Sequence, residues 1–410
     1  MKTKTFILVA AIISAFSSQV YGRTMVATKS PLKLPEVLSK ETVVSTNKPV
    51  FLRKGPTIQI AVLIDTSNSM DGLISQAKNQ LWDIINETAK ANKNDTPVFI
   101  EVSLIEYGKR SLAASSGYIR QIMPLTQDLD ALSLNLFNLK TNGGDEYAGQ
   151  AIHQAVDELA WSPHEDDLKF IVIAGNESFA QGEAVSYAYA IKQAVKNNIM
   201  INTVFCGDKQ KGINLKWRDG AKRGGGVYLN INQDEQMVHI ATPYDERINT
   251  LGKKLNKTYI GHGVYGDEKK AMQESVDALN ASSSRTQLTK RTLSKASVNY
   301  DASSWDVVSS FKASGSAEKQ RDIVDAAKKE TAFHGMSDEE VRETIASLSK
   351  ERVRIEKNIA SLNLKREQYI YQQGASKKDT FGDKLVRSIK EASIKKGYVF
   401  PAHSSGRYQE

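Results

Sequence analysis

Residues 59–69 read QIAVLIDTSNS, and this stretch does most to decide the fold of the chain. An apolar run closed by polar residues is typical of a strand buried in a parallel sheet. The strand would carry Asp65, Ser67 and Ser69 to its carboxyl end. One carboxylate and two hydroxyls on a tight turn are hard oxygen donors, which small divalent cations prefer. The pattern therefore predicts a metal-centred contact surface and not a catalytic pocket.

Similar runs recur along the chain and alternate with helical patterns. Apolar runs occupy residues 58–64, 98–105, 170–174, 199–205 and 227–231, and helical periodicity marks 73–89, 147–159, 184–195 and a short stretch near Trp217. This alternation indicates an α/β fold, a doubly wound, Rossmann-like and mostly parallel sheet with helices on both faces, followed by a helical C-terminal region. In such sheets ligands bind beyond the carboxyl ends of the strands, which is where Asp65 stands.

Further segments complete the predicted domain. Residues 118–124 are predicted to pair with 102–107 as a hairpin, 233–255 to form a final helix interrupted at Pro243, and 257–261 to form a short closing strand. We predict a signal peptide at 1–22, a linker at 23–55, the α/β domain at 56–262 and a helical, coiled-coil C-terminal region at 263–410.

Two more loops carry oxygen donors. The loop TNGGDE at 141–146 precedes a predicted helix, and its two glycines let the backbone pass close to another group while Asp145 adds an acid. The loop GNE at 175–177 follows the run 170–174 and would bring Asn176 or Glu177 to the same edge of the sheet. Donors that converge from three loops favour a divalent cation. The alternative is a set of turns whose Asp and Ser residues only cap helices.

These motifs resemble a von Willebrand factor type A domain. Asp65-x-Ser67-x-Ser69 matches the first motif of the family's metal-ion-dependent adhesion site, Asp145 stands nearest the position of the metal-binding Thr, and Asn176 stands where the family has an Asp. The stretches IAGNE and WRDGA, at 173–177 and 217–221, resemble an exported bacterial subgroup.

The resemblance implies a role for each matched residue. Asp65 would orient the ion or its waters, Ser67 and Ser69 would ligate the ion directly, Asp145 would ligate it, and Asn176 would hold a metal-bound water. The implied ion is Mg²⁺, with Mn²⁺ or Ca²⁺ as substitutes. The acid in place of Thr makes this a variant site, and two acids already present would make a partner's carboxylate less welcome than a neutral oxygen or water.

The bulk properties restrict the location and the partners. Residues 1–22 combine positive Lys2 and Lys4 with a short apolar stretch, which predicts a cleaved signal peptide and a periplasmic or secreted protein. The single Cys206 excludes an intrachain disulfide and is expected to be buried at a strand end. A net charge of +8 is a mild bias and no signature of nucleic-acid binding.

The C-terminal region contains a long heptad-like helix. SDEE at 337–340 is a capping box, and an apolar stripe then recurs at spacings of about four and three until the helix ends before Gly374. Arg352 and Arg366 occupy skipped core positions, so we expect a helix pair with 318–335 or a partner that carries acids, and assembly through this tail. Tyr300, Trp305 and neighbouring apolar residues are expected to dock on another element. The stretch 381–400 is basic and amphipathic, and the basic end at 377–396 is expected to be solvated, with binding to a membrane surface or a polyanion as the alternative.

Together these features predict an exported, metal-dependent protein-binding module of adhesion or scaffold type. Its partner would be another protein, bound at the rim of the metal-site loops, and not a nucleic acid. The sequence contains no H-E-x-x-H motif, nucleophile elbow or phosphate-binding loop, so we expect no enzyme. The alternatives are a hydrolase in which the ion activates water, and a structural module with an empty metal site.

Overall fold

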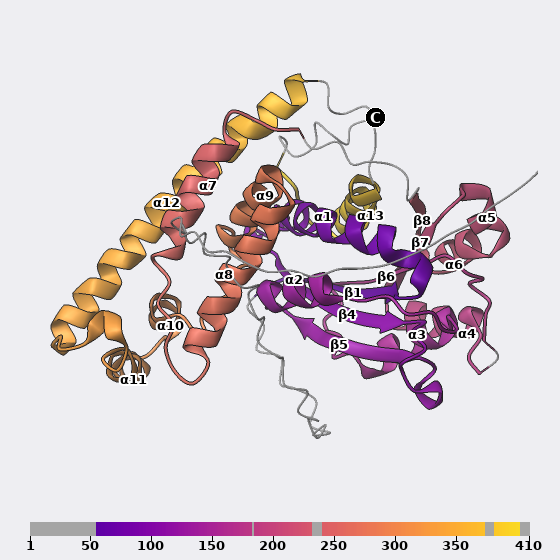
Figure 1. Cartoon of the computed structure of the whole chain (residues 1–410), viewed down its shortest axis with the longest axis horizontal. Helices are drawn as coiled ribbons and strands as arrows, with labels where there is room; N and C mark the ends of the chain where they lie inside the picture. The colour runs from indigo at the N-terminus through magenta and orange to yellow at the C-terminus, as the bar shows by residue number, and fades with distance from the viewer. Residues whose placement is uncertain (1–54, 183, 232–239, 374–380, 402–410) are drawn as a thin grey trace, which may run out of the picture. The chain divides into compact units, whose positions relative to one another are not determined.

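A six-stranded sheet with the strand order β5-β4-β1-β6-β7-β8 forms the centre of the fold in the computed structural model (Figure 1). The structure describes residues 55–182, 184–231, 240–373 and 381–401. The strands are β1 (Thr57–Asp65), β4 (Phe99–Tyr107), β5 (Ile119–Thr126), β6 (Leu168–Gly175), β7 (Ile199–Cys206) and β8 (Gly225–Ile231). Only β5 runs antiparallel within this sheet, as the partner of β4. The predicted α/β class and the predicted hairpin are both confirmed.

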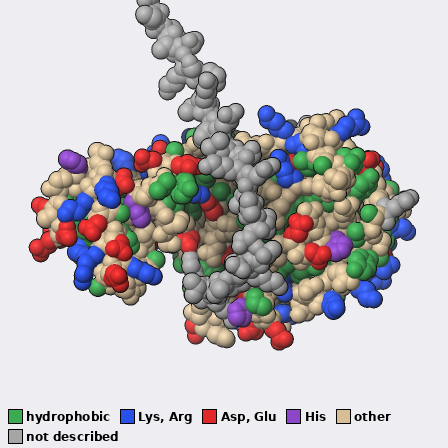
Figure 2. All heavy atoms as spheres, turned by 90° about the horizontal axis from the view of Figure 1, so that it is seen from below, with side chains coloured by type: hydrophobic (Ala, Val, Ile, Leu, Met, Phe, Trp, Pro, Cys, Tyr) green, Lys and Arg blue, Asp and Glu red, His purple; other side chains and the backbone are tan. Residues whose placement is uncertain are grey.

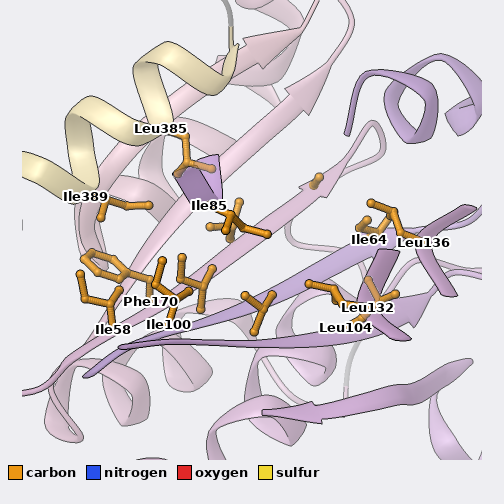
Figure 3. Packing of buried hydrophobic residues seen from close by; sticks show 14 of the residues in the cluster. Ile58, Ile64, Ile85, Ile100, Leu104, Leu132, Leu136, Phe170, Leu385 and Ile389 are labelled. Atoms are coloured by element: carbon orange, nitrogen blue, oxygen red, sulfur yellow. The ribbon is translucent and has the colours of Figure 1, made fainter. Parts of the chain in front are cut away.

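Helices cover both faces of the sheet because its strands are apolar on both sides. One face packs against α1 (Asp71–Thr88), α2 (Leu129–Asn138) and α13 (Phe381–Lys395), and the other against α3 (Ala148–Glu158), α4 (Tyr187–Lys196) and α6 (Trp217–Arg223). Figure 3 shows the first of these cores, in which Ile389 of α13 lies over Phe170 and Leu132 of α2 lies beside Leu104 of β4, with Ile85 of α1 in the same cluster.

Local signals set the shorter elements. A small hairpin of β2 (Asn92–Lys93) and β3 (Thr96–Pro97) turns through Asn94 and Asp95, whose φ angles of 51° and 58° suit the Asn and Asp that tolerate left-handed backbone. The helix predicted from residue 184 begins at Tyr187, because the Ser186 side chain accepts a hydrogen bond from the Tyr189 amide and caps it. A short α5 (Lys209–Asn214) follows β7.

Two predictions after the sheet need correction. Of the predicted helix 233–255, the described part is helical only in α7 (Asp245–Asn256), because Thr242 and Asp245 form a hydrogen-bonded turn before it. Residues 233–239 lie outside the described residues. The predicted signal peptide and residues 23–54 of the linker lie outside them as well. The predicted strand 257–261 is wrong. Tyr259 instead stacks on Trp305, with ring centroids 5.8 Å apart, and only an isolated bridge joins Gly261 to Asp306.

The C-terminal region is helical, as predicted. Its helices are α8 (Gly266–Ser283), α9 (Arg285–Lys295), α10 (Val307–Ala313), α11 (Ala317–Ala327), α12 (Asp338–Gln372) and α13, with a 3₁₀ turn at Thr331–Phe333. Trp305 is buried, so the predicted docking of the 300–311 stretch is confirmed. None of the described helices combines the length and the apolar character that crossing a bilayer requires.

The long helix α12 begins with the predicted capping box at Ser337 and Glu340. Its apolar stripe packs on α7, α10 and α11 of the same chain. Arg352 and Arg366 are buried in this seam and pair with Asp306 and Asp245, at 2.8 and 2.9 Å. The acids that these core arginines require therefore come from the chain itself, and only the first part of α12 meets α11.

Three elements of the C-terminal region complete the first face of the sheet. The α8, α9 and α13 helices pack on α1, α2 and β8. The Trp82 indole of α1 donates a hydrogen bond to Asn280 of α8 (2.8 Å), and Lys390 of α13 pairs with Glu87 of α1 (3.1 Å). The apolar face of α13, including Leu385 and Ile389, is buried against this core. That face is therefore turned to the sheet and not to solvent.

Candidate metal centre

The end of β1 places Asp65 at the carboxyl edge of the sheet, where its side chain is fully buried. The Ser67 amide donates a hydrogen bond to Asp65 Oδ1 (2.7 Å), which forms the tight Asx turn that Asp favours. The Thr66 amide donates to the Tyr107 carbonyl on β4 (2.9 Å). These bonds hold Asp65 and Ser67 in one fixed turn at the strand end.

The loop 141–146 closes on this turn through backbone contacts. The Asn142 amide donates to the Thr66 carbonyl (2.9 Å), and the Gly143 amide donates to Asn68 Oδ1 (3.0 Å). On its other side, the Gly143 carbonyl accepts a hydrogen bond from the Arg110 amide (3.2 Å). The loops 65–68, 108–110 and 141–146 thus meet at one edge of the sheet, as the sequence predicted for the first and the last of them.

The acid that this closure brings to Asp65 is Glu146. Glu146 is buried, and its carboxyl group is in hydrogen-bonding contact with that of Asp65 when one of the two carries a proton. The Ser67 side chain interacts with both carboxyl groups. Asp145 is exposed instead, and its carboxylate contacts the Tyr147 phenol.

The sequence alone could not separate these two acids. Asp145 and Glu146 are neighbours, and only the backbone path before α3 decides which side chain turns inward. One signal was available. Glu146 is two residues from Ala148, the buried first residue of α3, and is therefore closer than Asp145 to a part of the chain that turns inward.

Gly108 closes the third side of the centre and was not predicted. It follows β4 with a φ of +75°, and a Cβ at this position would lie 2.8 Å from Asp65 Oδ1 and 2.7 Å from Glu146 Cγ. Both acids therefore lie directly against a backbone that has room for no side chain.

Gly108→Ala is expected to destabilise the fold by about 1–3 kcal/mol, because strained backbone and displaced carboxyl groups add together. Gly263→Ala is the matched control, since Gly263 has a φ of +74° but nothing within 4 Å of its Cβ position. Urea unfolding of both variants measures the difference. Equal losses for the two would mean that the acids do not pack on Gly108.

Burial raises the pKa of both acids. The pKa of Asp65 rises from 3.8 to about 6, and that of Glu146 from 4.5 to about 9, through loss of solvent and, for Glu146, through the neighbouring charge of Asp65. Asp65 Oδ2 and Glu146 Oε2 receive no hydrogen bond from the part of the chain that the structure describes. Two buried, facing carboxyl oxygens without a donor call for a shared proton or a cation.

The other buried acid at this edge, Glu106, is already neutralised. Its carboxylate pairs with Lys109 (3.3 Å) and Arg120 and lies 3.4 Å from the Thr66 hydroxyl. Glu106 therefore supports the turn and offers no carboxylate to an ion.

The loop after β6 contributes less. Asn176 is half-buried one residue beyond the strand, and Glu177 is exposed, although its charge acts on both Asp65 and Glu146. Ser69 lies in a 3₁₀ turn (Asn68–Met70), and its side chain is outside the described residues. The structure thus brings together Asp65 and Ser67 of the predicted ligands, and adds Glu146.

These residues fit a small hard cation. No group of three or more His, Cys, Asp or Glu side chains within residues 55–401 as described is arranged to hold a metal. Mg²⁺, however, is commonly held by one or two carboxylates and completes its shell with water. Two donor-free carboxyl oxygens, from Asp65 and Glu146, and the Ser67 hydroxyl match that requirement.

A second polar cluster, away from this edge, does not make a nucleophile. His262 Nε2 lies 2.7 Å from the Ser310 hydroxyl, but that hydroxyl donates its proton to the Ser303 carbonyl (2.7 Å). The serine is therefore not activated by the imidazole, as a catalytic dyad would require.

The family comparison matches the part of the chain that contains this centre. Residues 59–216 match the von Willebrand factor type A domain. The match covers less than half of the 410 residues, and it includes every residue of the centre described above. The sheet with its two helical layers is the Rossmann-like fold of von Willebrand factor type A domains.

Several solved structures are similar to less than half of this chain. The von Willebrand factor type A structure from Catenulispora acidiphila is 16% identical, over 43% of this chain and 39% of that one, with a TM-score of 0.33. Proximal thread matrix protein 1 from the mussel byssus, with a zinc-occupied MIDAS motif, is 15% identical, over 44% and 43%, with a TM-score of 0.33. The pilus adhesin SpaC from Lactobacillus rhamnosus GG is 12% identical, over 44% and 28%, with a TM-score of 0.32.

This chain spans less than half the length of these three proteins. At such TM-scores they say nothing of how it works. No curated protein matches the chain.

Proposed function

We propose that the protein binds another protein through a divalent cation held at the Asp65–Glu146 edge of the sheet. The observation that supports this most directly is the pair of buried carboxyl oxygens that no described residue satisfies. A bound cation would remove the cost of burying two facing acids. Von Willebrand factor type A domains commonly mediate protein–protein contacts, which agrees with a site that ends in loops.

The contact surface in this proposal is the rim formed by the loops 65–68, 108–110, 141–146 and 175–177. Asp65, Ser67 and Glu146 would hold the ion, and Mg²⁺ is the ion that the oxygen donors suit best. When bound, the ion supplies a positive centre that an oxygen of the partner can reach. Asp145 would lie at this rim and Asn176 near it. Neither is among the proposed ligands of the ion.

We also propose that the protein is exported and acts in the periplasm or outside the cell. This rests on the sequence pattern of residues 1–22 alone. Positive and negative side chains are interspersed on the face shown in Figure 2, which agrees with a protein partner better than with a polyanion.

Addition of Mg²⁺ to the EDTA-treated protein is expected to raise its melting temperature, because a ligand that only the native state binds stabilises it, by about 2.7 kcal/mol at a hundredfold excess over Kd. The same ion should be required to capture a partner from cell-envelope extract, and the captured native protein should begin at Arg23. Asp145→Ala is the control that should keep the melting response to Mg²⁺, because Asp145 is not among the proposed ligands. A melting temperature that millimolar Mg²⁺ and Mn²⁺ leave unchanged would refute the metal site.

A further inference from the structure

Among the described residues, no Lys or Arg pairs with Asp65 or Glu146, although two such side chains pair with Glu106, a third acid at the same edge. Glu106 is held by Lys109 and Arg120, whereas no ion pair reaches Asp65 or Glu146 from the described residues. Metal ligands bind in their deprotonated form. With an ion bound, this pair therefore supplies two negative charges, which neutralise a divalent cation completely.

Two acids lie on the rim close to the pair, Glu177 and Asp145. Glu177 is exposed, and its charge acts on both buried carboxyl groups. Asp145 is exposed on the loop that carries Glu146. Arg110, whose amide bonds to that loop, is an exposed cation that offsets one of these two acids. A carboxylate that approached the occupied site would meet an ion whose charge is already neutralised, with the Glu177 carboxylate close by, and like charges disfavour such a contact.

We infer that the partner completes the coordination of the ion with a neutral oxygen, from a peptide carbonyl, an amide or a hydroxyl, and not with a carboxylate. Glu146 fills from within the chain the anionic position that a partner's acid would otherwise occupy. The inference rests on the proposed function, because it requires a cation at this site. In this inference Glu146 determines whether the partner binds the ion with a neutral oxygen or with a carboxylate.

The test measures Mn²⁺ binding by electron paramagnetic resonance of the free ion, with acetate and acetamide as probes of the two partner chemistries. Each titration is run in sodium acetate, in acetamide with sodium chloride, and in sodium chloride alone at equal ionic strength, and is corrected with a protein-free series. For the wild type we expect the same Mn²⁺ affinity in acetate and in chloride. For Glu146→Gln we expect binding in chloride to weaken by about tenfold or more, and acetate to restore part of the loss.

Asp145→Asn is the matched control, because it removes a rim charge and not a proposed ligand. Mn²⁺ should bind it in chloride as tightly as it binds the wild type, and acetate should tighten Mn²⁺ binding far less than for Glu146→Gln. Glu146→Gln relieves a buried repulsion, so it should fold; a circular dichroism melting curve checks this. The inference is overturned if acetate tightens Mn²⁺ binding to the wild type as much as to Glu146→Gln, or if Asp145→Asn becomes the acetate-dependent variant. Absence of any Mn²⁺ binding by the wild type overturns the proposed function itself, and is a distinct result.

Discussion

Asp65→Asn should make the cation-free protein more stable and, at the same time, abolish its response to Mg²⁺. The amide oxygen can keep the hydrogen bond from the Ser67 amide, and the new amide N–H groups can donate to Glu146 Oε2, which receives no hydrogen bond from the described residues. Satisfying a buried charged acceptor is worth about 1–3 kcal/mol. The loss of one charged ligand removes most of the attraction for a divalent cation.

The stabilisation should depend on pH in a defined direction. Both acids have raised pKa values in the fold, so the cation-free wild type loses stability as pH rises from the ordinary carboxyl range through about 6 and on toward 9. The advantage of Asp65→Asn should therefore be small at pH 4 and large at pH 8. Urea unfolding at both pH values, with EDTA and with Mg²⁺, measures it. If the variant is less stable than the wild type at pH 8 in EDTA, the two carboxyl groups do not oppose each other.

Arg352→Ala should be the most destabilising single change on the long helix α12, at about 3–5 kcal/mol, because it leaves Asp306 buried without its counter-ion. The Arg352 guanidinium bonds to Asp306 Oδ2 and the Ser309 hydroxyl, each at 2.8 Å, and lies 3.9 Å from the centre of the Tyr259 ring. All of these contacts are lost together.

Arg354→Ala provides the matched control two residues further along the same helix. Arg354 is exposed and pairs with Glu351 (2.7 Å), and such surface pairs are worth only about 0.2–1 kcal/mol. Denaturant unfolding of the two variants side by side gives the comparison. Similar losses for both would show that α12 is not held to the chain through Arg352.

The sequence predicted the strands well because each one is a continuous apolar run, which two-sided burial in a parallel sheet demands. It also identified Asp65 and Ser67 as neighbours at one strand end, since the turn that joins them is local. The sequence did not predict Glu146, because the choice between two adjacent acids depends on loop contacts to Thr66 and Asn68.

Pairings between segments that are far apart in the chain could not be predicted from the sequence either. Arg352 and Arg366 could be recognised at core positions from their spacing, but their partners lie 46 and 121 residues away in the chain. The false strand at 257–261 has the same origin. Its apolar residues are buried, but by Trp305 and α12 and not by a neighbouring strand.

The docking of α13 has a consequence for how the molecule is made. One layer over the sheet combines α1, which is synthesised early, with α13, which is synthesised some 300 residues later, and the two share a core through Ile85 and Ile389. During synthesis the part of this core that α13 covers stays exposed until most of the chain has left the ribosome. A fragment that stops at residue 262 would lack α8, α9 and α13 and leave the surface that they cover on α1, α2 and β8 exposed, so the natural folding unit reaches well beyond the segment that the family model recognises.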